Sequence, residues 1–540
     1  MPTPMKGTGT KIVIEWAPDK NSPIPLYQQI VDYISAKIAA GDYASGVQLP
    51  SQRDMAQQFG VNRSTIVTAM EELMSYGVIE SHSAHGTRVA DMLWSPKHRK
   101  QPPNWSHYVK QGTVPANSIM MQRLNHYEAS SDILQFSTDQ LSFDVFPTKL
   151  LESVMGKVAA QKPDLGYLQP QGLPELRSVL AQRLAYHRNI HVPESCILLT
   201  TGQVQTMTLI RNCLLKPGSS IFTERYSWLY SHPRQTTSMK VRPVPMDEEG
   251  LCYWQIHLDP EKDTSPLVYT MPNYHNPTTL TMSQERRRQL LGFCQNRQLP
   301  IIENDIYGNL FLENTPPPSL KSMDESGTVL YVSALNKELS PALGMAYMVA
   351  PESVVERLAD MKRQTSDMLS FYAQWMLVRM LNDHTFDDYL TYVRSRLIER
   401  RDMMLYLLQK HFSGLAKWRI PDGGYFIWLE FNEDIPLDQL FEKALLNNIL
   451  ICPGTLFTQD KSNGLRLSFS YVPEKDMERG LKTLAQLAET LKKHLEFFTL
   501  RFFRSYFEER KECFLCPQFI SVPRFRSSIP ISPVETKNIT

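Results

Sequence analysis

The chain has 540 residues with a formal net charge of +1; 42% of them are hydrophobic and 21% are charged. This length exceeds what one hydrophobic core supports, so a multidomain chain is expected, and the composition excludes a disordered or membrane-embedded protein. With no apolar run long enough to cross a bilayer, no apolar signal core in the first ten residues and only scattered cysteines, we expect a cytoplasmic protein without a membrane partner.

The N-terminal ninety residues have the pattern of three short helices followed by a β-hairpin. Apolar residues at helical spacing predict a first helix that ends before Gly41. Ser51 is placed to cap a second helix, and Gly60 is placed to end it. Asn62 is placed to cap a third helix, and the stretch 79–89 reads as a hairpin.

A helix, a glycine turn and a second helix make a shape that fits the major groove of DNA. The second of these helices opens on Asn62-Arg63-Ser64-Thr65, where short polar groups, a guanidinium and free backbone N–H groups favour phosphate. A helical bundle without a DNA-binding role is the alternative. Met1–Trp94 carries seven basic and nine acidic residues, so its net charge is −2, and we expect DNA binding to depend on dimerisation.

Four stretches of this segment carry a specific pattern: Pro25-Leu26-Tyr27, Leu49-Pro50-Ser51-Gln52-Arg53, Gly60-Val61-Asn62-Arg63-Ser64-Thr65-Ile66-Val67 and Gly86-Thr87. They resemble the GntR family of bacterial winged-helix regulators. The resemblance implies an α+β winged helix-turn-helix domain that contacts operator DNA through Arg53, Arg63, Ser64, Thr65, His85 and Gly86. Val67 stands where some members carry a second arginine, which leaves base readout open.

After Trp94 the sequence becomes polar and rich in Pro, Lys and Arg, which predicts a linker. Short apolar runs of β type then alternate with helical stretches, at Ile197–Thr200, Ile221–Glu224, Leu267–Met271, Pro300–Glu303, Val329–Ser333 and Ala346–Val349. This alternation predicts an α/β domain with a mostly parallel sheet covered on both faces, followed by a smaller α+β segment.

These patterns divide the chain into a DNA-binding domain at 1–93, a linker at 94–120, a large domain at 121–494 and a C-terminal extension at 495–540. The extension contains one C-x-x-C pair, Cys513 and Cys516. A single pair is not enough to predict a zinc site, so we expect no metal.

Lys337 follows an apolar strand, where a buried lysine is placed to form a Schiff base with an aldehyde cofactor. Motifs recur around it in a fixed order: Tyr167-Leu168-Gln169-Pro170-Gln171-Gly172, Thr201-Gly202-Gln203, Pro272-Asn273-Tyr274-His275-Asn276-Pro277, Asn304-Asp305-Ile306-Tyr307, Asn336-Lys337, Gly423-Gly424-Tyr425 and Leu465-Arg466-Leu467-Ser468. They resemble the pyridoxal-phosphate aminotransferases of fold type I. Because a GntR module precedes this domain, the chain is identified as a member of the MocR subfamily.

The resemblance implies a role for each motif residue toward pyridoxal 5'-phosphate. Lys337 would react with the aldehyde, and Trp228 would stack on the pyridine ring. Asn276 and Tyr307 would hydrogen-bond the ring 3′ oxygen, and Asn304 would face the ring nitrogen. Ordinary core packing is the alternative for each aromatic residue taken singly.

Four further residues complete the implied site. Gly202 and Gln203, at a helix start, would offer backbone N–H groups to the phosphate. Tyr167 would reach the phosphate of the partner subunit, so a homodimer is expected. Arg466 would hold the carboxylate of a substrate with its two-pronged guanidinium.

The sequence departs from the family pattern at three positions. Asn304 replaces the carboxylate that holds the pyridinium proton, with Asp305 beside it. Ala334 and Gly344 stand where a serine and an arginine usually bind the phosphate. Losing one charge-assisted hydrogen bond costs roughly 1.5–3 kcal/mol, so weak cofactor binding is an open alternative. Lys240 and Arg234 are candidate replacements for the lost cation.

Three functions follow from these patterns. The first is a regulator that binds pyridoxal phosphate, senses an amine or amino acid and changes its affinity for operator DNA. The second is a working aminotransferase with an accessory DNA-binding domain, which Asn304 and Gly344 disfavour. The third uses the large domain only as a dimerisation scaffold. The effector, the operator and the direction of regulation are not encoded in these motifs.

Overall fold

The computed structural model describes residues 16–22, 24–40, 42–44, 46–82, 86–90, 117–130, 132–142, 145, 148–159, 166–232, 236, 238–366 and 368–513, with side chains given as far as Lys493. The chain divides into two compact units, Met1–Pro115 and Ala116–Thr540. In these described ranges, no helix is long and apolar enough to span a membrane.

The first unit consists of three helices and a hairpin: α1 (Leu26–Ala39), α2 (Gln52–Phe59), α3 (Arg63–Ser75), β1 (Ile79–His82) and β2 (Gly86–Val89). Ser51 caps α2 as predicted, because its Oγ accepts a hydrogen bond from the backbone N–H of Asp54 at 3.2 Å. Gly60 ends that helix with φ of +64°, a left-handed conformation that favours glycine. Asn62 precedes α3 but its side chain forms no cap, contrary to the prediction.

The helices of this unit enclose a separate hydrophobic core. Its buried members include Ile34, Phe59, Ile66 and Leu73. The strands β1 and β2 pair antiparallel, with Ile79 opposite Val89. The predicted helix-turn-helix and hairpin are therefore confirmed, and the tip of the wing at 83–85 lies outside the described residues.

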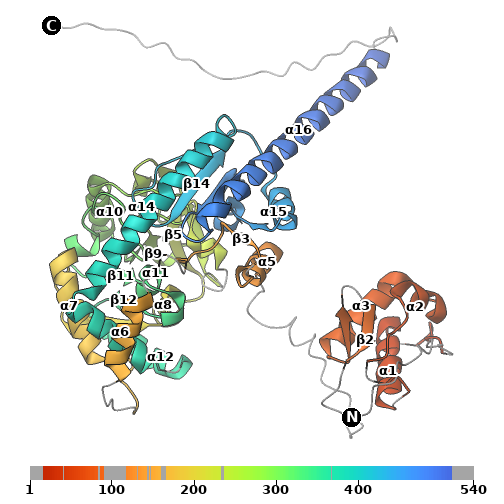
Figure 1. Ribbon diagram of the computed structural model, residues 1–540, viewed down its shortest axis with the longest axis horizontal. Helices are drawn as coiled ribbons and strands as arrows, with labels where there is room; N and C mark the ends of the chain where they lie inside the picture. Colours follow the sequence, from red (N-terminus) through yellow and green to blue (C-terminus); the bar gives the residue numbers. More distant parts are fainter. Residues whose placement is uncertain are drawn as a thin grey trace. The chain divides into compact units, whose positions relative to one another are not determined.

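A seven-stranded sheet forms the centre of the second unit (Figure 1). Its strands, in spatial order, are β4 (Ile197–Thr200), β12 (Ala346–Val349), β11 (Val329–Ser333), β10 (Ile301–Asn304), β9 (Thr264–Thr270), β5 (Ser219–Glu224) and β6 (Lys240–Val244). Only β12 runs antiparallel to its neighbours. The predicted mostly parallel sheet is confirmed, although β6 was not predicted.

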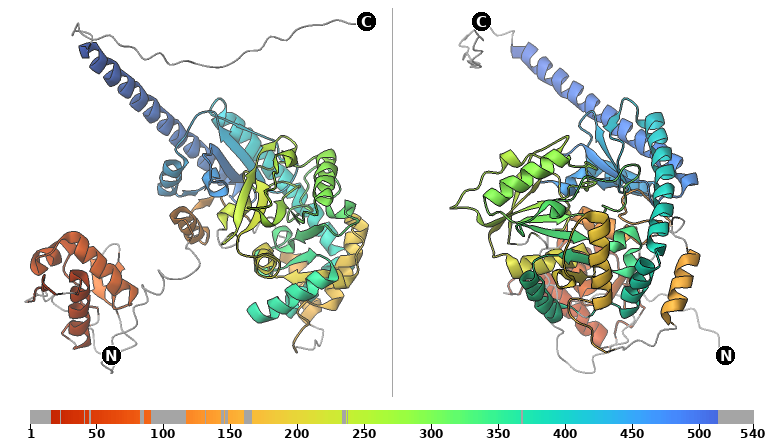
Figure 2. Two further views of the ribbon diagram at one scale, coloured as in Figure 1. Left: turned by 180° about the vertical axis from the view of Figure 1, so that it is seen from behind. Right: turned by 90° about the vertical axis from the view of Figure 1, so that its left-hand side faces the viewer.

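Both faces of this sheet are covered by helices (Figures 1 and 2). The main helices are α6 (Thr148–Ala159), α7 (Pro174–Arg188), α8 (Gln203–Leu214), α10 (Gln284–Asn296), α12 (Glu352–Thr365), α13 (Phe371–Asn382) and α14 (Thr385–Phe412). Successive residues of β5 belong to different cores: Ile221 lies in the large core, whereas Phe222 lies in a smaller one with Leu290 of α10. This alternation is what a strand buried on both faces requires.

A smaller antiparallel sheet follows in the chain: β13 (Ala416–Trp418), β14 (Phe426–Phe431), β17 (Gly464–Ser468) and β16 (Cys452–Pro453). Two helices flank it, α15 (Leu437–Leu446) and α16 (Glu474–Cys513). The helix α16 continues through residue 494, where the sequence patterns predict a domain boundary, and extends away from the rest of its domain (Figure 2). At the other end, α5 (Ile119–Glu128) includes the last two residues of the predicted linker.

Candidate functional site

The candidate site lies where three neighbouring strands of the large sheet end. Asn276 follows β9, Tyr307 follows β10, and Lys337 lies in the short helix α11 (Leu335–Glu338) after β11. Because β9, β10 and β11 are parallel, their carboxyl ends meet at one edge of the sheet. Open α/β sheets bind their ligands at this edge.

Asp139 connects the predicted lysine to the predicted tyrosine. The Lys337 Nζ donates a hydrogen bond to Asp139 Oδ2 at 2.6 Å, and the Tyr307 hydroxyl donates to Asp139 Oδ1 at 2.7 Å. A second hydroxyl, that of Tyr425, donates to the same Oδ1 at 2.7 Å. Lys337 is therefore held as one half of an ion pair with a carboxylate that the sequence patterns did not single out.

Asn276 and Arg466 extend this contact chain. The Asn276 Nδ2 donates to the Tyr307 hydroxyl at 3.3 Å, and its Oδ1 accepts from the Arg466 guanidinium at 2.8 Å. Arg466 also donates to the carbonyl of Ser137 at 2.6 Å, while its Nε is buried without a hydrogen-bond partner among the described residues. Lys337, Tyr307, Asn276 and Arg466, predicted from separate motifs, thus lie in one network.

The charges at this site determine which groups are ionised. Burial alone would raise the pKa of Asp139, but the charges of Lys337 and Arg466 and the hydrogen bonds from Lys337 and Tyr307 outweigh it, so the pKa falls below its usual value. Burial, together with the nearby charge of Lys337, lowers the pKa of His232 to about 4. Asp139 is therefore a carboxylate and His232 a neutral ring near pH 7.

Asn304 lies at the carboxyl end of β10, fully buried. Its Nδ2 donates to Gln203 Oε1 at 3.0 Å and to the Tyr269 hydroxyl at 2.6 Å. Its Oδ1 is buried and has no hydrogen-bond partner within the described part of the chain. A buried acceptor of this kind is normally satisfied, so this atom is open to a hydrogen bond from a bound molecule.

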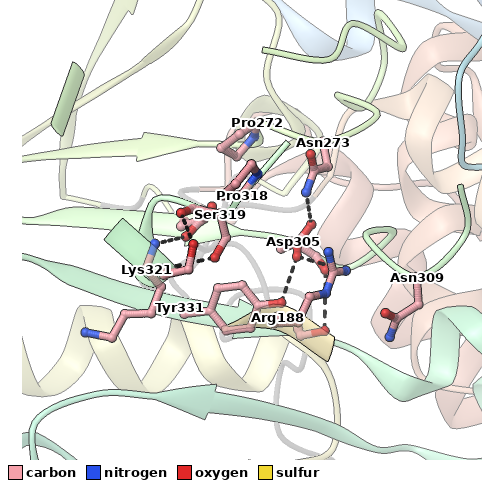
Figure 3. A network of polar contacts seen from close by, with 12 residues as sticks. Arg188, Pro272, Asn273, Asp305, Asn309, Pro318, Ser319, Lys321 and Tyr331 are labelled. Carbon is pink, nitrogen blue, oxygen red and sulfur yellow. Dashed lines mark hydrogen bonds and ion pairs between the residues drawn. The ribbon is translucent and has the colours of Figure 1, made fainter. Parts of the chain in front are cut away.

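Asp305 does not take over the part of the missing carboxylate. Figure 3 shows it among Asn273, Tyr331 and Arg188. Asn273 donates to it at 2.6 Å and the Tyr331 hydroxyl at 2.7 Å, while Arg188 forms an ion pair with it at 3.3 Å. Its oxygens already have these three partners, so Asp305 is part of a structural network. Asn304 is therefore the residue at the position predicted to face the ring nitrogen.

The start of α8 provides the predicted phosphate end of the site. Gly202 precedes the helix and Gln203 is its first residue. A Cβ atom on Gly202 would lie 3.5 Å from the side chain of Asn336, the neighbour of Lys337, so the helix start and the lysine are close. Free backbone N–H groups at such a helix start attract anions.

Neither of the two phosphate-binding side chains of the family pattern is present at its position in the chain. Ala334 is buried before α11, and Gly344 adopts a left-handed φ of +50°, with its missing Cβ position 3.7 Å from the Thr201 carbonyl. Lys240, one suggested substitute, is exposed on β6 and donates to the carbonyl of Lys262, which is a correction to that expectation. Arg234, the other, lies outside the described residues.

Trp228 and Tyr167 have different environments. Trp228 is buried in a single helical turn, η3 (Trp228–Ser231), and stacks on His232 with the ring centroids 4.0 Å apart. Stacking on a cofactor ring therefore needs the opposite face of the indole. Tyr167 is 88% exposed and borders a cavity of about 310 Å³ that Lys362 and Gln374 also line, and none of the residues that line this cavity belongs to the Lys337 network.

The predicted DNA-contacting residues lie on the surface of the first unit. Arg53, Arg63 and Ser64 are exposed and Thr65 is partly exposed, at or near the start of the two helices of the helix-turn-helix. Gly86 is exposed as the first residue of β2, next to the tip of the wing, with a left-handed φ of +74°. His85 lies outside the described residues.

Sequence reasoning missed three residues of the site. Asp139, Tyr425 and Tyr269 contact predicted residues directly. Tyr425 was within a recognised glycine motif and Tyr269 within a predicted strand, so both had a signal, whereas Asp139 had none. In the residues that the structure describes, no group of three or more His, Cys, Asp or Glu side chains is arranged to hold a metal ion.

Two family models match the chain. The model described as aminotransferase class I and II matches residues 131–484, and the model of bacterial regulatory proteins of the gntR family matches residues 26–89. Together they account for both compact units in the order that the motifs predicted.

Curated relatives share the whole arrangement. The uncharacterized HTH-type transcriptional regulator YisV of Bacillus subtilis is 38% identical over 88% of this chain and 99% of its own length. The HTH-type transcriptional regulator NorG of Staphylococcus aureus is 29% identical, over 81% of this chain and 98% of its own.

Solved structures resemble the second unit. The kynurenine aminotransferase of Pyrococcus horikoshii, solved in complex with PMP, is 25% identical with a TM-score of 0.65 and covers 70% of this chain and 96% of its own. An archaeal alanine:glyoxylate aminotransferase, 23% identical with a TM-score of 0.66, covers 72% of this chain and 99% of its own and shares the fold.

Proposed function

Because the chain belongs to the MocR subfamily of GntR transcription regulators, in which a winged helix-turn-helix precedes an aminotransferase class I and II domain, we propose that its large domain binds pyridoxal 5'-phosphate and senses an amine or amino acid. The chain is a DNA-binding transcription regulator. Ligand binding at the large domain would change its affinity for operator DNA.

One observation carries this proposal: Lys337, Tyr307, Asn276 and Arg466 lie in a single hydrogen-bonded network at the carboxyl edge of the sheet. These side chains come from four separate segments of the chain. A folded core does not need a lysine, a tyrosine, an asparagine and an arginine to meet at one buried point, whereas a ligand site does.

The residues present fit pyridoxal phosphate. The unpartnered Asn304 Oδ1 is an acceptor that a protonated ring nitrogen would fill, and the start of α8 is a cradle for the phosphate. When bound, the cofactor supplies an aldehyde that combines with primary amines. The relative from Pyrococcus horikoshii, solved in complex with PMP, supports the same assignment.

The chain's own residues would position and shield this chemistry. Lys337 is only 14% exposed, so bulk water has little access to its amine. Tyr307 donates to Asp139 in the structure and is placed to hold a proton near the lysine. Asn276 orients both the Tyr307 hydroxyl and the Arg466 guanidinium, so a change at one end of the network reaches the other.

An active aminotransferase is the second candidate function. The pairing of Arg466 with Asn276 favours it, because a guanidinium held in this way is placed to bind a substrate carboxylate. Asn304 and Gly344 oppose it: an amide stabilises a ring cation less than a carboxylate does, and Gly344 stands where an arginine usually binds the phosphate. We therefore favour a ligand-sensing regulator over an active aminotransferase.

In this proposal the protein acts as a homodimer in the cytoplasm, where operator DNA is found. Tyr167 supports the dimer, since it is 88% exposed, as a residue reaching toward a partner subunit would be. Two DNA-binding modules would also compensate for the low basic charge of a single one.

The proposal is tested with purified full-length protein, pyridoxal phosphate and a promoter fragment from its own locus. In the wild type we expect a visible absorbance band that disappears on borohydride reduction, and in Lys337→Ala we expect no such band. We also expect a mobility shift of the DNA that changes when amines are added. A protein that stays colourless in excess cofactor would refute the sensing part, and amino-group exchange to 2-oxoglutarate that Lys337→Ala abolishes would favour the enzyme.

A further inference from the structure

Asp139 is a carboxylate positioned directly on the reactive lysine. It accepts hydrogen bonds from Lys337, Tyr307 and Tyr425, all at 2.6 or 2.7 Å. The Lys337 Nζ also donates to the backbone carbonyl of Asp139 at 3.0 Å. The amine that would meet the cofactor aldehyde therefore already has a negatively charged neighbour, supplied by the chain itself.

The segment that carries Asp139 is fixed on both sides. The backbone N–H of Ser468 donates to the Phe136 carbonyl at 2.7 Å, and the Ser470 hydroxyl donates to the Gln140 carbonyl at 2.6 Å. These bonds attach the residues before and after Asp139 to the end of β17. The carboxylate is thus a built-in feature of the site.

A ligand can still reach this pair. The side chain of Lys337 is 14% exposed and that of Asp139 is 22% exposed. A small ammonium group that enters the site would find in Asp139 the same kind of partner that Lys337 has in the free protein. An opposite charge at this distance favours the charged form of an amine.

A ligand carboxylate would meet a less favourable environment. The guanidinium of Arg466 already donates to Asn276 and to the Ser137 carbonyl, so only its remaining N–H groups are open to a carboxylate. It would also come close to the charge of Asp139, which lies within electrostatic reach of Arg466. Two carboxylates sharing one small site repel each other.

We propose that Asp139 is a specificity-determining residue that makes the site select primary amines without a carboxylate on the amine-bearing carbon. This inference rests on the proposed function, and it narrows the effector from amines and amino acids to the first of these classes. The Asp139 carboxylate already supplies a negative charge near Arg466, in the space that an amino-acid carboxylate would otherwise occupy.

The test compares ligands that differ only in the carboxylate, ethylamine against alanine and phenylethylamine against phenylalanine. Each is titrated into cofactor-loaded wild type, Asp139→Asn and Asp139→Gly while the visible absorbance of the cofactor is followed. In the wild type the amine of each pair acts at a lower concentration. In both variants we expect the ratio of amine to amino-acid affinity to fall at least about tenfold, a change of roughly 1.4 kcal/mol.

Glu128→Gln is the matched control. Glu128 ends α5 within electrostatic reach of Arg466 and Lys337, but no hydrogen bond joins it to Lys337 in the described structure. Its loss should leave the ratio within about twofold of the wild type. An equal change in Glu128→Gln and in the Asp139 variants would overturn the inference, because any nearby acid would then have the same effect.

A second readout does not need the cofactor. Alanine should raise the melting temperature of cofactor-free Asp139→Asn, where no negative charge at position 139 repels its carboxylate, and leave that of the wild type unchanged. If the wild type and variants load cofactor normally but the ligand ratio does not change, only this inference fails. If none of them takes up cofactor, the proposed function fails and the inference fails with it.

Discussion

The side chain of Asn304 donates a hydrogen bond to Gln203 Oε1 at 3.0 Å, which ties the carboxyl end of β10 to the first residue of α8. Both side chains are buried. The end of the site proposed for the ring nitrogen and the end proposed for the phosphate are therefore one connected unit, and a change at Asn304 should affect cofactor binding without disturbing the sheet.

Asn304→Asp should strengthen cofactor binding. A carboxylate at this position would form a charge-assisted hydrogen bond with a protonated ring nitrogen, which is roughly twice as strong as a neutral one. We expect the dissociation constant for pyridoxal phosphate to fall about tenfold, the equivalent of about 1.4 kcal/mol. Titration of the visible absorbance in wild type and variant measures the change.

Asn304→Ala is the matched control for that experiment, because it removes the acceptor without adding charge. Its affinity should be at or below that of the wild type. If aspartate and alanine at this position give the same dissociation constant, residue 304 does not face the ring nitrogen.

Asp305→Asn should lower the stability of the large domain. Arg188 is 14% exposed and Asp305 is fully buried, so the substitution leaves a guanidinium with little access to water and without its ion pair to Asp305 (Figure 3). Breaking a buried pair by removing one partner costs about 3–5 kcal/mol. Thermal unfolding of the full chain should show a lower transition for the large domain, and the double variant Arg188→Met with Asp305→Asn should recover part of the loss.

The sequence predicted the buried strands better than the edge strand. The strands β4, β11 and β12 were predicted with their observed bounds, because every residue in them is buried and their apolar runs are uninterrupted. The edge strand β6 contains Lys240, Arg242 and Pro243, which hide the β pattern. Proline and charge are tolerated there because only one side of an edge strand must pair.

For the site, local motifs predicted residues that lie at the ends of strands, and they could not predict Asp139. That residue follows β3 (Leu134–Gln135), a two-residue strand that pairs with β15 (Ile449–Leu450) far along the chain. It meets Lys337 across a separation of 198 residues. A contact of that kind depends on the assembled fold, and no periodicity or spacing in the sequence encodes it.

Glu303 should make stability depend on pH. Burial raises its pKa from 4.5 to about 7, although the backbone N–H groups of Leu320 and Lys321 both donate to its carboxyl group. The folded protein therefore binds a proton that the unfolded chain releases above pH 4.5. This proton contributes on the order of 3 kcal/mol to the free energy of unfolding. The contribution is fully present below pH 4.5 and is lost as the pH rises toward 7.

Glu303→Gln should flatten this dependence. Denaturant unfolding of wild type and variant at several pH values between 5 and 8 gives the slope of unfolding free energy against pH for each protein. As the pH rises, the variant should become more stable relative to the wild type. Glu325→Gln, at an exposed position, is the control and should follow the wild type. Parallel curves for wild type and Glu303→Gln would show that Glu303 keeps the same charge in both states.

Arg63→Ala should weaken operator binding. Arg63 is the first residue of α3 and is exposed, where it is placed to contact either a phosphate or a base edge. We expect a loss of about 1–3 kcal/mol, or roughly tenfold to a hundredfold in the dissociation constant. A phosphate contact would weaken binding to operator and unrelated DNA alike and reduce the salt slope by about 1, whereas a base contact would weaken operator binding alone. Arg225→Ala, which removes an exposed cation from the other unit, should leave both affinities unchanged, and an equal loss in the two variants would show that only overall charge matters.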